Sequence, residues 1–288
     1  MPPRPLRSVL YVPASNARAL EKARTLPCDA VIVDLEDAVA PVAKPAARSA
    51  AVAAIRGGGW GHRLVALRVN GLETPWGLAD VAVAAASGAH AVVLPKVEDA
   101  AAVGTADRAL GMHGAPAELE LWAMIETPRG VLAAAEIAAA SPRLSCLVAG
   151  TSDLVKDLRA RHTPSRLEVL PALGLMLLAA RAAGLSALDG VHLDLQDDAG
   201  FEAACRQGRD LGFDGKTLIH PRTIEAANRL FAPDAAEVAA ARAVIDAHAA
   251  AQARGEGVTV VDGRLVEALH VEMARRTVAL AEAIAARG

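Results

Sequence analysis

The stretch Ala30-Val-Ile-Val-Asp-Leu-Glu-Asp37 decides the fold class of this chain. It begins with four apolar residues and ends in acidic side chains, and a helical pattern follows it over Lys44–Ile55. A continuous apolar strand is typical of a parallel sheet that helices cover on both faces, whereas a half-exposed strand alternates polar and apolar residues. The stretch therefore predicts one strand–helix unit of an α/β protein.

The same unit repeats along the chain. Further strands are predicted at Arg7–Ala14, Arg63–Asn70, Ala91–Lys96, Leu119–Thr127, Leu144–Gly150, Leu188–Leu193 and Gly215–His220. Helices are expected at Asn16–Leu26 with Ser15 as N-cap, from Thr74-Pro75, at Glu98–Leu110, from Pro128, at Arg166–Ala183, at Ala199–Leu211 and from Pro221. Eight alternating units in about 230 residues match the closed (β/α)8 TIM barrel.

A doubly wound open sheet is the alternative architecture. Such a sheet would need a glycine-rich phosphate-binding turn after its first strand, where this chain has Pro13-Ala14-Ser15-Asn16. We therefore expect residues 1–232 to form a TIM-barrel catalytic domain.

Residues 233–288 are expected to form a C-terminal extension. The pattern predicts a helix over Asp234–Arg254, a hairpin over Val258–Val266 that turns at Asp262-Gly263, and a last helix over His270–Ala286. A segment of this size is too small for a core of its own. We expect it to pack on the barrel or on a neighbouring subunit.

Composition excludes several classes of function. The chain has 288 residues, is 53% hydrophobic and 2% aromatic, and carries a net charge of −3. It has no basic stripe, so nucleic-acid binding is disfavoured, and no apolar run approaches the roughly 18 residues of a membrane span. The N-terminus lacks the apolar region of a signal peptide. Three cysteines without a C-x-x-C pair indicate reduced thiols in a cytoplasmic protein.

Polar residues gather at the carboxyl ends of the predicted strands. TIM-barrel enzymes place their active sites at this rim, and polar groups at the end of an apolar strand are costly unless they are paired or bind a metal. Polar residues at the ends of most of the predicted strands together predict an active site at this rim. The residues are Asp34, Glu36, Asp37, Arg68, Asn70, Lys96, Glu126, Asp153, His192, Asp194 and His220.

Glu126 and Asp153 are the candidate metal ligands. They follow neighbouring strands of the predicted barrel, and two carboxylates suit Mg2+, which keeps positions for water and substrate. No Cys/His cluster favours zinc. The alternative is structural: Glu126 would pair with Arg129 or cap the helix that follows it.

Two features near these carboxylates predict binding of an anion. Gly150-Thr151-Ser152 precedes Asp153, and a turn led by glycine can direct several backbone N–H groups at a substrate carboxylate. The alternative, which can hold at the same time, is a simple strand-to-helix turn with an N-cap. Arg68 lies in an apolar strand, so its guanidinium must face Glu36, Asp37 or an anionic substrate. The alternative is a structural salt bridge to the preceding strand.

Other polar residues near the rim have less specific meanings. Lys22, Lys44, Arg48 and Lys96 are solvated residues or, as a cluster, a site for the phosphates of a nucleotide-like group. His192 and His220 could be metal ligands, acid–base groups or partners in an orienting hydrogen bond.

Short motifs along nearly the whole chain resemble those of one family. They are Leu10-Tyr-Val-Pro-Ala14, Val33-Asp-Leu-Glu-Asp-Ala-Val39, Arg68-Val-Asn70, Leu94-Pro-Lys96, Ile125-Glu-Thr127, Gly150-x-x-Asp153, Leu188-Asp-Gly190, Gly212-Phe-Asp-Gly-Lys216 and Ile219-His-Pro221. In this order they resemble the citrate lyase β-subunit-like branch of the HpcH/HpaI aldolase superfamily, which includes malyl-CoA and citramalyl-CoA lyases.

The resemblance implies roles for individual residues. Glu126 and Asp153 match the metal ligands, and Arg68 matches the arginine that contacts the substrate carbonyl oxygen. Glu36 and Asp37 would orient Arg68 and metal-bound water. The positions that would touch the CoA thioester include Tyr11, Pro13, Lys22, Ile219, His220 and Pro221.

The C-terminal tail resembles a lid that reaches a neighbouring protomer. The family has a catalytic aspartate there, shortly before a His-Val pair. The matching residue here is Glu267, in Val266-Glu-Ala-Leu-His-Val271, so the carboxylate is kept on a side chain that is one methylene longer. The resemblance therefore implies Glu267 as the acid/base group.

The resemblance implies a Mg2+-dependent carbon–carbon lyase, with Mn2+ as a substitute metal. It would cleave a β-hydroxyacyl-CoA, such as malyl-CoA or citramalyl-CoA, into an acyl-CoA and an α-keto acid, or form it from them. CoA is then part of the substrate, and a homo-oligomer, trimer or hexamer, is expected. The alternatives are a malyl-CoA-type thioesterase on the same site, a CoA-independent class II pyruvate aldolase, and a non-catalytic metabolite-binding subunit.

Overall fold

The computed structural model of the chain describes residues 4–287. The chain forms two compact units, one spanning Leu6–Asn228 and the other made of the described residues before Leu6 and those from Arg229 onward. The larger unit contains the strands predicted above, and the smaller one is the C-terminal extension.

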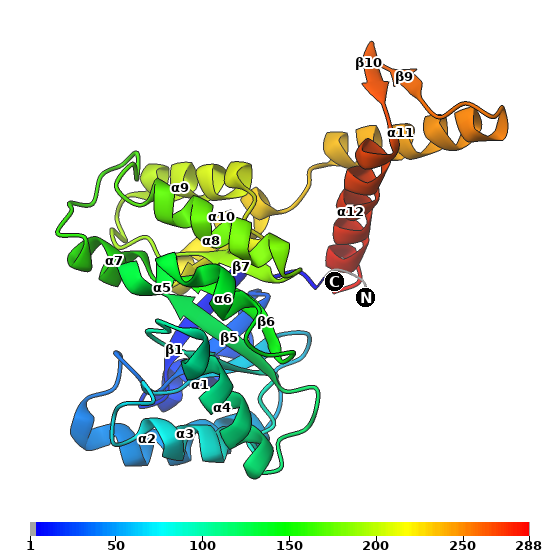
Figure 1. Ribbon diagram of the computed structural model, residues 1–288. Coiled ribbons are helices and arrows are strands. Elements are labelled where there is room, and N and C mark those ends of the chain that lie inside the picture. The colour runs from blue at the N-terminus through cyan, green and yellow to red at the C-terminus, as the bar shows by residue number, and fades with distance from the viewer. Residues whose placement is uncertain (1–3, 288) are drawn as a thin grey trace. The chain divides into compact units, whose positions relative to one another are not determined.

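The larger unit is a closed barrel of eight parallel strands in chain order (Figure 1). Each strand pairs with the next, and the last pairs back to the first through Ser8 and Lys216. The strands are β1 (Ser8–Pro13), β2 (Ala30–Asp34), β3 (Leu64–Arg68), β4 (Ala91–Leu94), β5 (Glu120–Ile125), β6 (Leu144–Ala149), β7 (Ser186–Asp189) and β8 (Gly215–Leu218). The predicted TIM barrel is confirmed.

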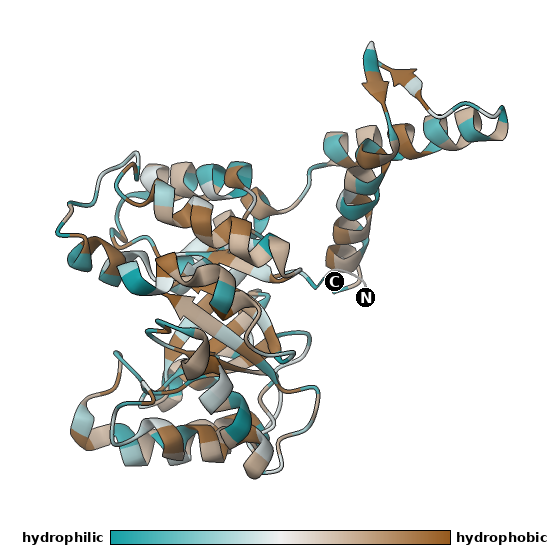
Figure 2. Cartoon of the chain, in the orientation of Figure 1, coloured by the Kyte–Doolittle hydropathy of each residue, from teal (hydrophilic) through white to brown (hydrophobic). Residues whose placement is uncertain are grey.

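Helices connect and cover the strands, and bands of polar and apolar residues alternate along them (Figure 2). They are α1 (Ala17–Ala23), α2 (Lys44–Arg56), α3 (Gly77–Ala84), α4 (Ala100–Met112), α5 (Pro128–Leu132), α6 (Ala134–Ala138), α7 (Thr151–Asp157), α8 (Leu170–Ala182), α9 (Asp198–Leu211) and α10 (Ile224–Phe231). The short 3-10 helices η1 (Pro41–Ala43) and η2 (Pro221–Thr223) precede α2 and α10.

Several predicted boundaries were wrong. Asn16, not Ser15, caps α1, because its side chain accepts a hydrogen bond from the Ala19 N–H. The helix expected from Thr74-Pro75 begins at Gly77, since the Thr74 hydroxyl bonds to Gly71 O within a turn. Helix α7 was missed, and β7 ends at Asp189, so His192 and Asp194 lie in the loop beyond it.

The barrel core explains the position of the polar residues. The buried core cluster takes alternate residues of the strands: Ala30 and Ile32, Leu64 and Ala66, Ala91 and Val93, Trp122 and Met124, and Cys146 and Val148. Side chains two residues apart on a strand lie on the same face. Asp34, Arg68 and Glu126 each come two residues after the last core residue of their strand. They therefore lie on the same face as the core residues, at the carboxyl ends of their strands.

A buried ion cluster links β7 and β8. The Lys216 Nζ lies 2.8 Å from Asp189 Oδ2, with the two side chains 1% and 0% exposed. Arg166 pairs with the other oxygen of the same carboxylate. Burial alone would raise the pKa of Asp189, but the two cations lower it. One buried carboxylate therefore pairs with two cations, one at each of its oxygens.

The smaller unit contains α11 (Ala235–Ala253), β9 (Thr259–Val261), β10 (Arg264–Val266) and α12 (Ala268–Ala285). Asp234 and Glu237 form a capping box at the start of α11. The two strands form the expected antiparallel hairpin, in which both turn residues, Asp262 and Gly263, have positive φ angles of 48° and 76°. The hairpin is mostly exposed, with Val260 65% and Leu265 55% accessible.

Two expectations from composition can be compared with the described residues. Over residues 4–287, no helix combines the length and the apolar character that crossing a membrane requires. Cys28, Cys146 and Cys205 are buried free thiols.

Candidate active site

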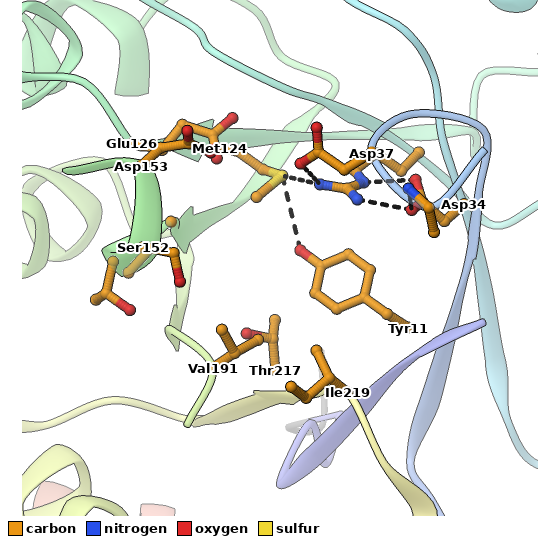
Figure 3. Close-up of a pocket in the computed structure, with 15 residues that line it drawn as sticks. Tyr11, Asp34, Asp37, Met124, Glu126, Ser152, Asp153, Val191, Thr217 and Ile219 are labelled. Atoms are coloured by element: carbon orange, nitrogen blue, oxygen red, sulfur yellow. Dashed lines mark hydrogen bonds and ion pairs between the residues drawn. The ribbon is translucent and has the colours of Figure 1, made fainter. Parts of the chain in front are cut away.

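A cavity of about 320 Å³ lies at the carboxyl ends of the barrel strands (Figure 3). Tyr11 reaches it from within β1, Asp34 and Arg68 from the ends of β2 and β3, and Glu126 follows β5. The other lining residues are Asp37, Ala38, Met124, Ala149, Gly150, Thr151, Ser152, Asp153, Val191, Thr217 and Ile219. Figure 3 shows Glu126 and Asp153 near each other, with Val191, Thr217 and Ile219 forming a separate part of the wall.

Arg68 is held by acidic residues from the end of β2. Its Nε and Nη2 bind the two oxygens of Asp34 at 2.6 and 2.7 Å. Its Nη1 lies 2.8 Å from Glu36 Oε2 and 3.6 Å from Asp37 Oδ2. The predicted partners Glu36 and Asp37 both face Arg68, and the bidentate pair with Asp34 is the salt bridge to the preceding strand that was the alternative. Asp34 and Arg68 are register partners on adjacent strands, which the sequence does not reveal.

The guanidinium of Arg68 also packs on Tyr11. The Arg68 Cζ lies 4.8 Å from the centroid of the Tyr11 ring, and the Tyr11 hydroxyl donates to Met124 Sδ at 3.7 Å. Burial alone would lower the pKa of Arg68, but the hydrogen bonds and charge of Asp34 raise it above its usual value. Burial raises the pKa of Tyr11. Arg68 is therefore a permanent cation in a fixed orientation beside a neutral phenol.

The two carboxylates predicted to bind metal are in the same cavity. Glu126 is 2% exposed, and its Oε1 accepts a hydrogen bond of 2.7 Å from the Lys96 N–H. Asp153 lies in the first turn of α7, with Lys156 Nζ at 3.4 Å. In residues 4–287 no group of three or more His, Cys, Asp or Glu could hold a metal. A pair of carboxylates fits Mg2+, which retains several waters.

The structural alternative for Glu126 was wrong. Arg129 lies 3.9 Å from Glu98, and the cap of α5 is Thr127, whose hydroxyl accepts from the Gly130 N–H. Glu126 therefore neither pairs with Arg129 nor caps α5.

Gly150 permits the close approach of β6 to Glu126. A Cβ built on Gly150 would lie 2.3 Å from Glu126 Cβ and 2.4 Å from Glu126 Oε2. Contacts of this length do not occur, so any other residue here would displace the carboxylate. Thr151 and Ser152 continue the chain along the cavity wall, and the Ser152 Oγ is buried without a hydrogen-bond partner. The predicted anion contact with these residues remains a prediction.

The electrostatics of Glu126 also fit a cation. Burial raises the pKa of its carboxyl to about 7, and the charges of Glu36 and Asp153 act in the same direction. The Lys96 N–H and the charge of Lys96 oppose the rise. A carboxylate that is destabilised by burial and by neighbouring carboxylates is one that a bound divalent cation would stabilise in its ionised form.

We expect the metal-free protein to lose stability because of Glu126 as pH rises from 4.5 to about 7. Its pKa is raised in the folded state from 4.5 to about 7, so the folded state binds the extra proton in this window and stability falls as that proton is lost. The loss is about 3 kcal/mol, at roughly 1.4 kcal/mol per pKa unit. Urea unfolding at pH 5 and pH 8 in EDTA checks this, with Glu126→Gln as the variant that removes the loss. Parallel pH dependences in the two proteins would contradict it.

The structure brings together part of the predicted CoA contacts. Tyr11 and Ile219 line the cavity. The remaining candidates lie outside the lining set: Pro13 ends β1, Lys22 is exposed in the last turn of α1, and His220 and Pro221 start η2. The His220 Nδ1 accepts a hydrogen bond from the Arg222 N–H, which is the orienting role among its predicted alternatives.

Lys44 and Arg48 are part of the folded structure and are not solvated surface residues. The buried Lys44 ammonium donates to the carbonyls of Leu35 and Glu36 at 2.9 and 3.0 Å. Arg48 pairs with Asp80, which is 1% exposed on its side chain. Lys44 thereby fixes the loop after β2 that carries Glu36 and Asp37.

Glu267 belongs to the smaller unit, where it is the N-cap residue of α12. Its backbone N–H donates to His270 Nδ1 at 3.0 Å. Its assignment as the acid/base group remains a prediction.

Comparison with known proteins defines the family. Residues 7–221 match the family model described as HpcH/HpaI aldolase/citrate lyase. The chain is 50% identical over 285 residues to a (3S)-malyl-CoA thioesterase of Cereibacter sphaeroides (strain KD131 / KCTC 12085), covering 98% of this chain and 96% of the relative. It is 37% identical over 281 residues to the citrate lyase subunit beta of Escherichia coli (strain K12), covering 96% and 93%. The chain belongs to the HpcH/HpaI aldolase/citrate lyase family.

Solved structures from Mycobacterium tuberculosis share the fold. The protein CitE in complex with magnesium, acetoacetate and coenzyme A aligns with a TM-score of 0.77 at 31% identity, covering 96% of this chain and 97% of that chain. A citrate lyase beta subunit complexed with oxaloacetate and magnesium aligns with a TM-score of 0.67 at 32% identity, covering 80% and 98%. Homologous structures therefore bind magnesium together with coenzyme A or small keto acids.

Proposed function

We propose that this chain is an enzyme that binds Mg2+ through Glu126 and Asp153 and acts on the CoA thioester of a hydroxydicarboxylic acid of the malyl type. One observation carries the proposal: a pair of carboxylates and a fixed guanidinium face the same small cavity. Mn2+ is expected to substitute for Mg2+. The complex of a homologue with magnesium, acetoacetate and coenzyme A supports this class of ligand.

Two reactions could use this site. Hydrolysis of the thioester is our first candidate, because relatives named (3S)-malyl-CoA thioesterase are 49–50% identical to the chain over nearly its full length. Carbon–carbon cleavage, which the sequence motifs put first, is the second candidate. The citrate lyase subunit beta relatives support it at 35–37% identity. A CoA-independent aldolase or a non-catalytic subunit has less support, because coenzyme A is bound in a homologue and the charged residues of the site are present here.

The residues of the chain have separate tasks in this proposal. When bound, Mg2+ would polarise the hydroxyl and carboxylate oxygens of the substrate. Arg68 would stabilise the negative charge that develops on the thioester oxygen. Asp34 and Tyr11 hold the guanidinium in place, so little reorganisation is needed during the reaction. Backbone N–H groups of Thr151 and Ser152, in the first turn of α7, would hold the substrate carboxylate, whereas the Gly150 N–H donates to the Ile125 carbonyl.

The two reactions differ in the bond that breaks. In hydrolysis, water attacks the thioester carbonyl carbon, the C–S bond breaks, and the free acid and CoA thiol leave. In the lyase reaction, a base removes the hydroxyl proton and the C–C bond breaks, which gives an α-keto acid and a thioester enolate that is then protonated. Glu267 of a neighbouring protomer, in a trimer or hexamer, is the proposed acid/base group for this proton.

We expect purified protein with Mg2+ and (3S)-malyl-CoA to release free thiol without accumulating α-keto acid. The assay follows thiol and keto acid in parallel, and EDTA should stop the release. Heat-inactivated protein gives the background of spontaneous hydrolysis. Keto acid formed in equal amount to acyl-CoA would instead make the chain a lyase. No product from malyl-CoA or citramalyl-CoA would contradict both candidates.

A further inference from the structure

Lys96 has an unusual backbone conformation at the edge of the active site. It lies two residues after the end of β4, and its φ angle is +48° although it is not a glycine. In this left-handed region the Cβ of an L-residue crowds the backbone, and such residues persist where the surrounding structure holds them. Pro95 precedes it, and the next residue, Val97, donates its N–H to the Met124 carbonyl of β5.

In this conformation both donors of Lys96 bind carboxylates of the site. Its backbone N–H donates to Glu126 Oε1 at 2.7 Å. Its Nζ donates to Glu36 Oε1 at 2.5 Å. The other oxygen of Glu36 lies 2.8 Å from Arg68 Nη1. Lys96 therefore connects Glu126, on the metal side of the cavity, with Arg68 through Glu36.

The charges around Arg68 explain why a second cation is needed. Asp34, Glu36 and Asp37 all face this one guanidinium. Without the Lys96 ammonium, Glu36 would have Arg68 as its ion-pair partner and would compete with Asp34 for the guanidinium. Alternatively, the Glu36 carboxylate would turn toward Glu126 on the metal side of the cavity. Either change would move Arg68 or Glu126 from the geometry described above.

We propose that Lys96 is a positioning residue that sets the spacing between Arg68 and the Glu126 carboxylate. Its amide fixes one group and its ammonium fixes the other. Lys96 is not among the residues that line the cavity, so it acts through its neighbours and not on the substrate. The inference rests on the proposed function in taking Glu126 as a metal ligand.

Three substitutions test the ammonium contact of Lys96 and leave its backbone N–H in place. Lys96→Met keeps the aliphatic stem and the backbone N–H but loses the charge. Lys96→Gly also keeps the N–H, and it tolerates a positive φ. Lys96→Arg keeps the charge. The matched control is Arg159→Gly, because Arg159 is another basic residue with a positive φ, of 56°, and lies outside the cavity lining.

The test measures kcat and KM for malyl-CoA and, without turnover, the affinity of the Mg2+-loaded protein for oxaloacetate by calorimetry. We expect Lys96→Met and Lys96→Gly to lower kcat and weaken oxaloacetate binding by roughly 10- to 100-fold each, the range for residues that orient metal ligands. KM should change less than kcat, and Lys96→Arg should recover most of both losses. Arg159→Gly should match the wild type.

Two results would overturn the inference. One is wild-type kcat and oxaloacetate affinity in Lys96→Met and Lys96→Gly. The other is a raised KM with unchanged oxaloacetate binding, which would make Lys96 a contact of the CoA group. A wild-type protein that binds no oxaloacetate with Mg2+ would instead remove the proposed function, and the inference with it. Binding without turnover of malyl-CoA would remove the substrate assignment alone, because the affinities of the variants still decide the role of Lys96.

Discussion

Replacing Glu126 by glutamine, or Asp153 by asparagine, is expected to lower Mg2+-dependent kcat/KM by roughly a thousandfold or more. Each change keeps the shape of the side chain but removes a charged ligand, and polarisation by a bound metal contributes several kcal/mol to such reactions. The barrel should remain folded. Glu126 is 2% exposed and burial raises its pKa. Replacing its carboxyl by a neutral amide adds no buried charge and should not destabilise the metal-free fold.

The measurement is a Mg2+ titration of the rate, with circular dichroism as the check on folding. Asp157→Asn is the matched control, since Asp157 lies on the same helix as Asp153 but outside the cavity lining. It should leave the metal dependence unchanged. A wild-type rate with Mg2+ in either Glu126→Gln or Asp153→Asn would remove that residue from the metal site.

Replacing Asp189 by alanine is expected to destabilise the barrel by about 3–5 kcal/mol, the usual cost of removing one partner of a buried ion pair. Lys216 is 1% exposed and Arg166 is 13% exposed on its side chain, and both bind this one carboxylate. The melting temperature should fall by roughly 10 °C. Thermal unfolding of the two proteins at pH 7 measures the difference.

A second substitution tests the cause of that loss. Asp189→Ala combined with Lys216→Met should recover part of the stability, because an apolar side chain then replaces the unpaired buried ammonium. Glu282→Ala is the control for an exposed pair, since Glu282 and Arg242 are 63% and 58% exposed, and it should change stability by less than about 1 kcal/mol. An Asp189→Ala protein as stable as Glu282→Ala would contradict the predicted role of the cluster.

The barrel was predictable because its strands carry a clear signal. Strands buried on both faces read as continuous apolar runs, and β2 and β3 are buried at every position. The polar residues Asp34, Arg68 and Glu126 were visible as the ends of these runs. The structure adds that these three side chains face the same cavity, because side chains two residues apart lie on the same face of a strand.

The partners within the site were less predictable. Pairing of Asp34 with Arg68 depends on the register of two strands, and the sequence does not contain that register. Helix α7 was not among the predicted helices, although it begins at the strand-to-helix turn that was the alternative for Gly150-Thr151-Ser152. The positive φ of Lys96 had no signal at all, since residues other than glycine seldom adopt it.

The central claim is that Glu126 and Asp153 hold a divalent cation beside Arg68. Crystals grown with Mn2+ and oxaloacetate test it most directly, because the anomalous scattering of manganese locates the metal independently of activity. The proposed site predicts one strong anomalous peak between the carboxylates of Glu126 and Asp153, with density for the keto acid next to it. A peak elsewhere in the chain, or none at saturating Mn2+, would contradict the proposed metal site.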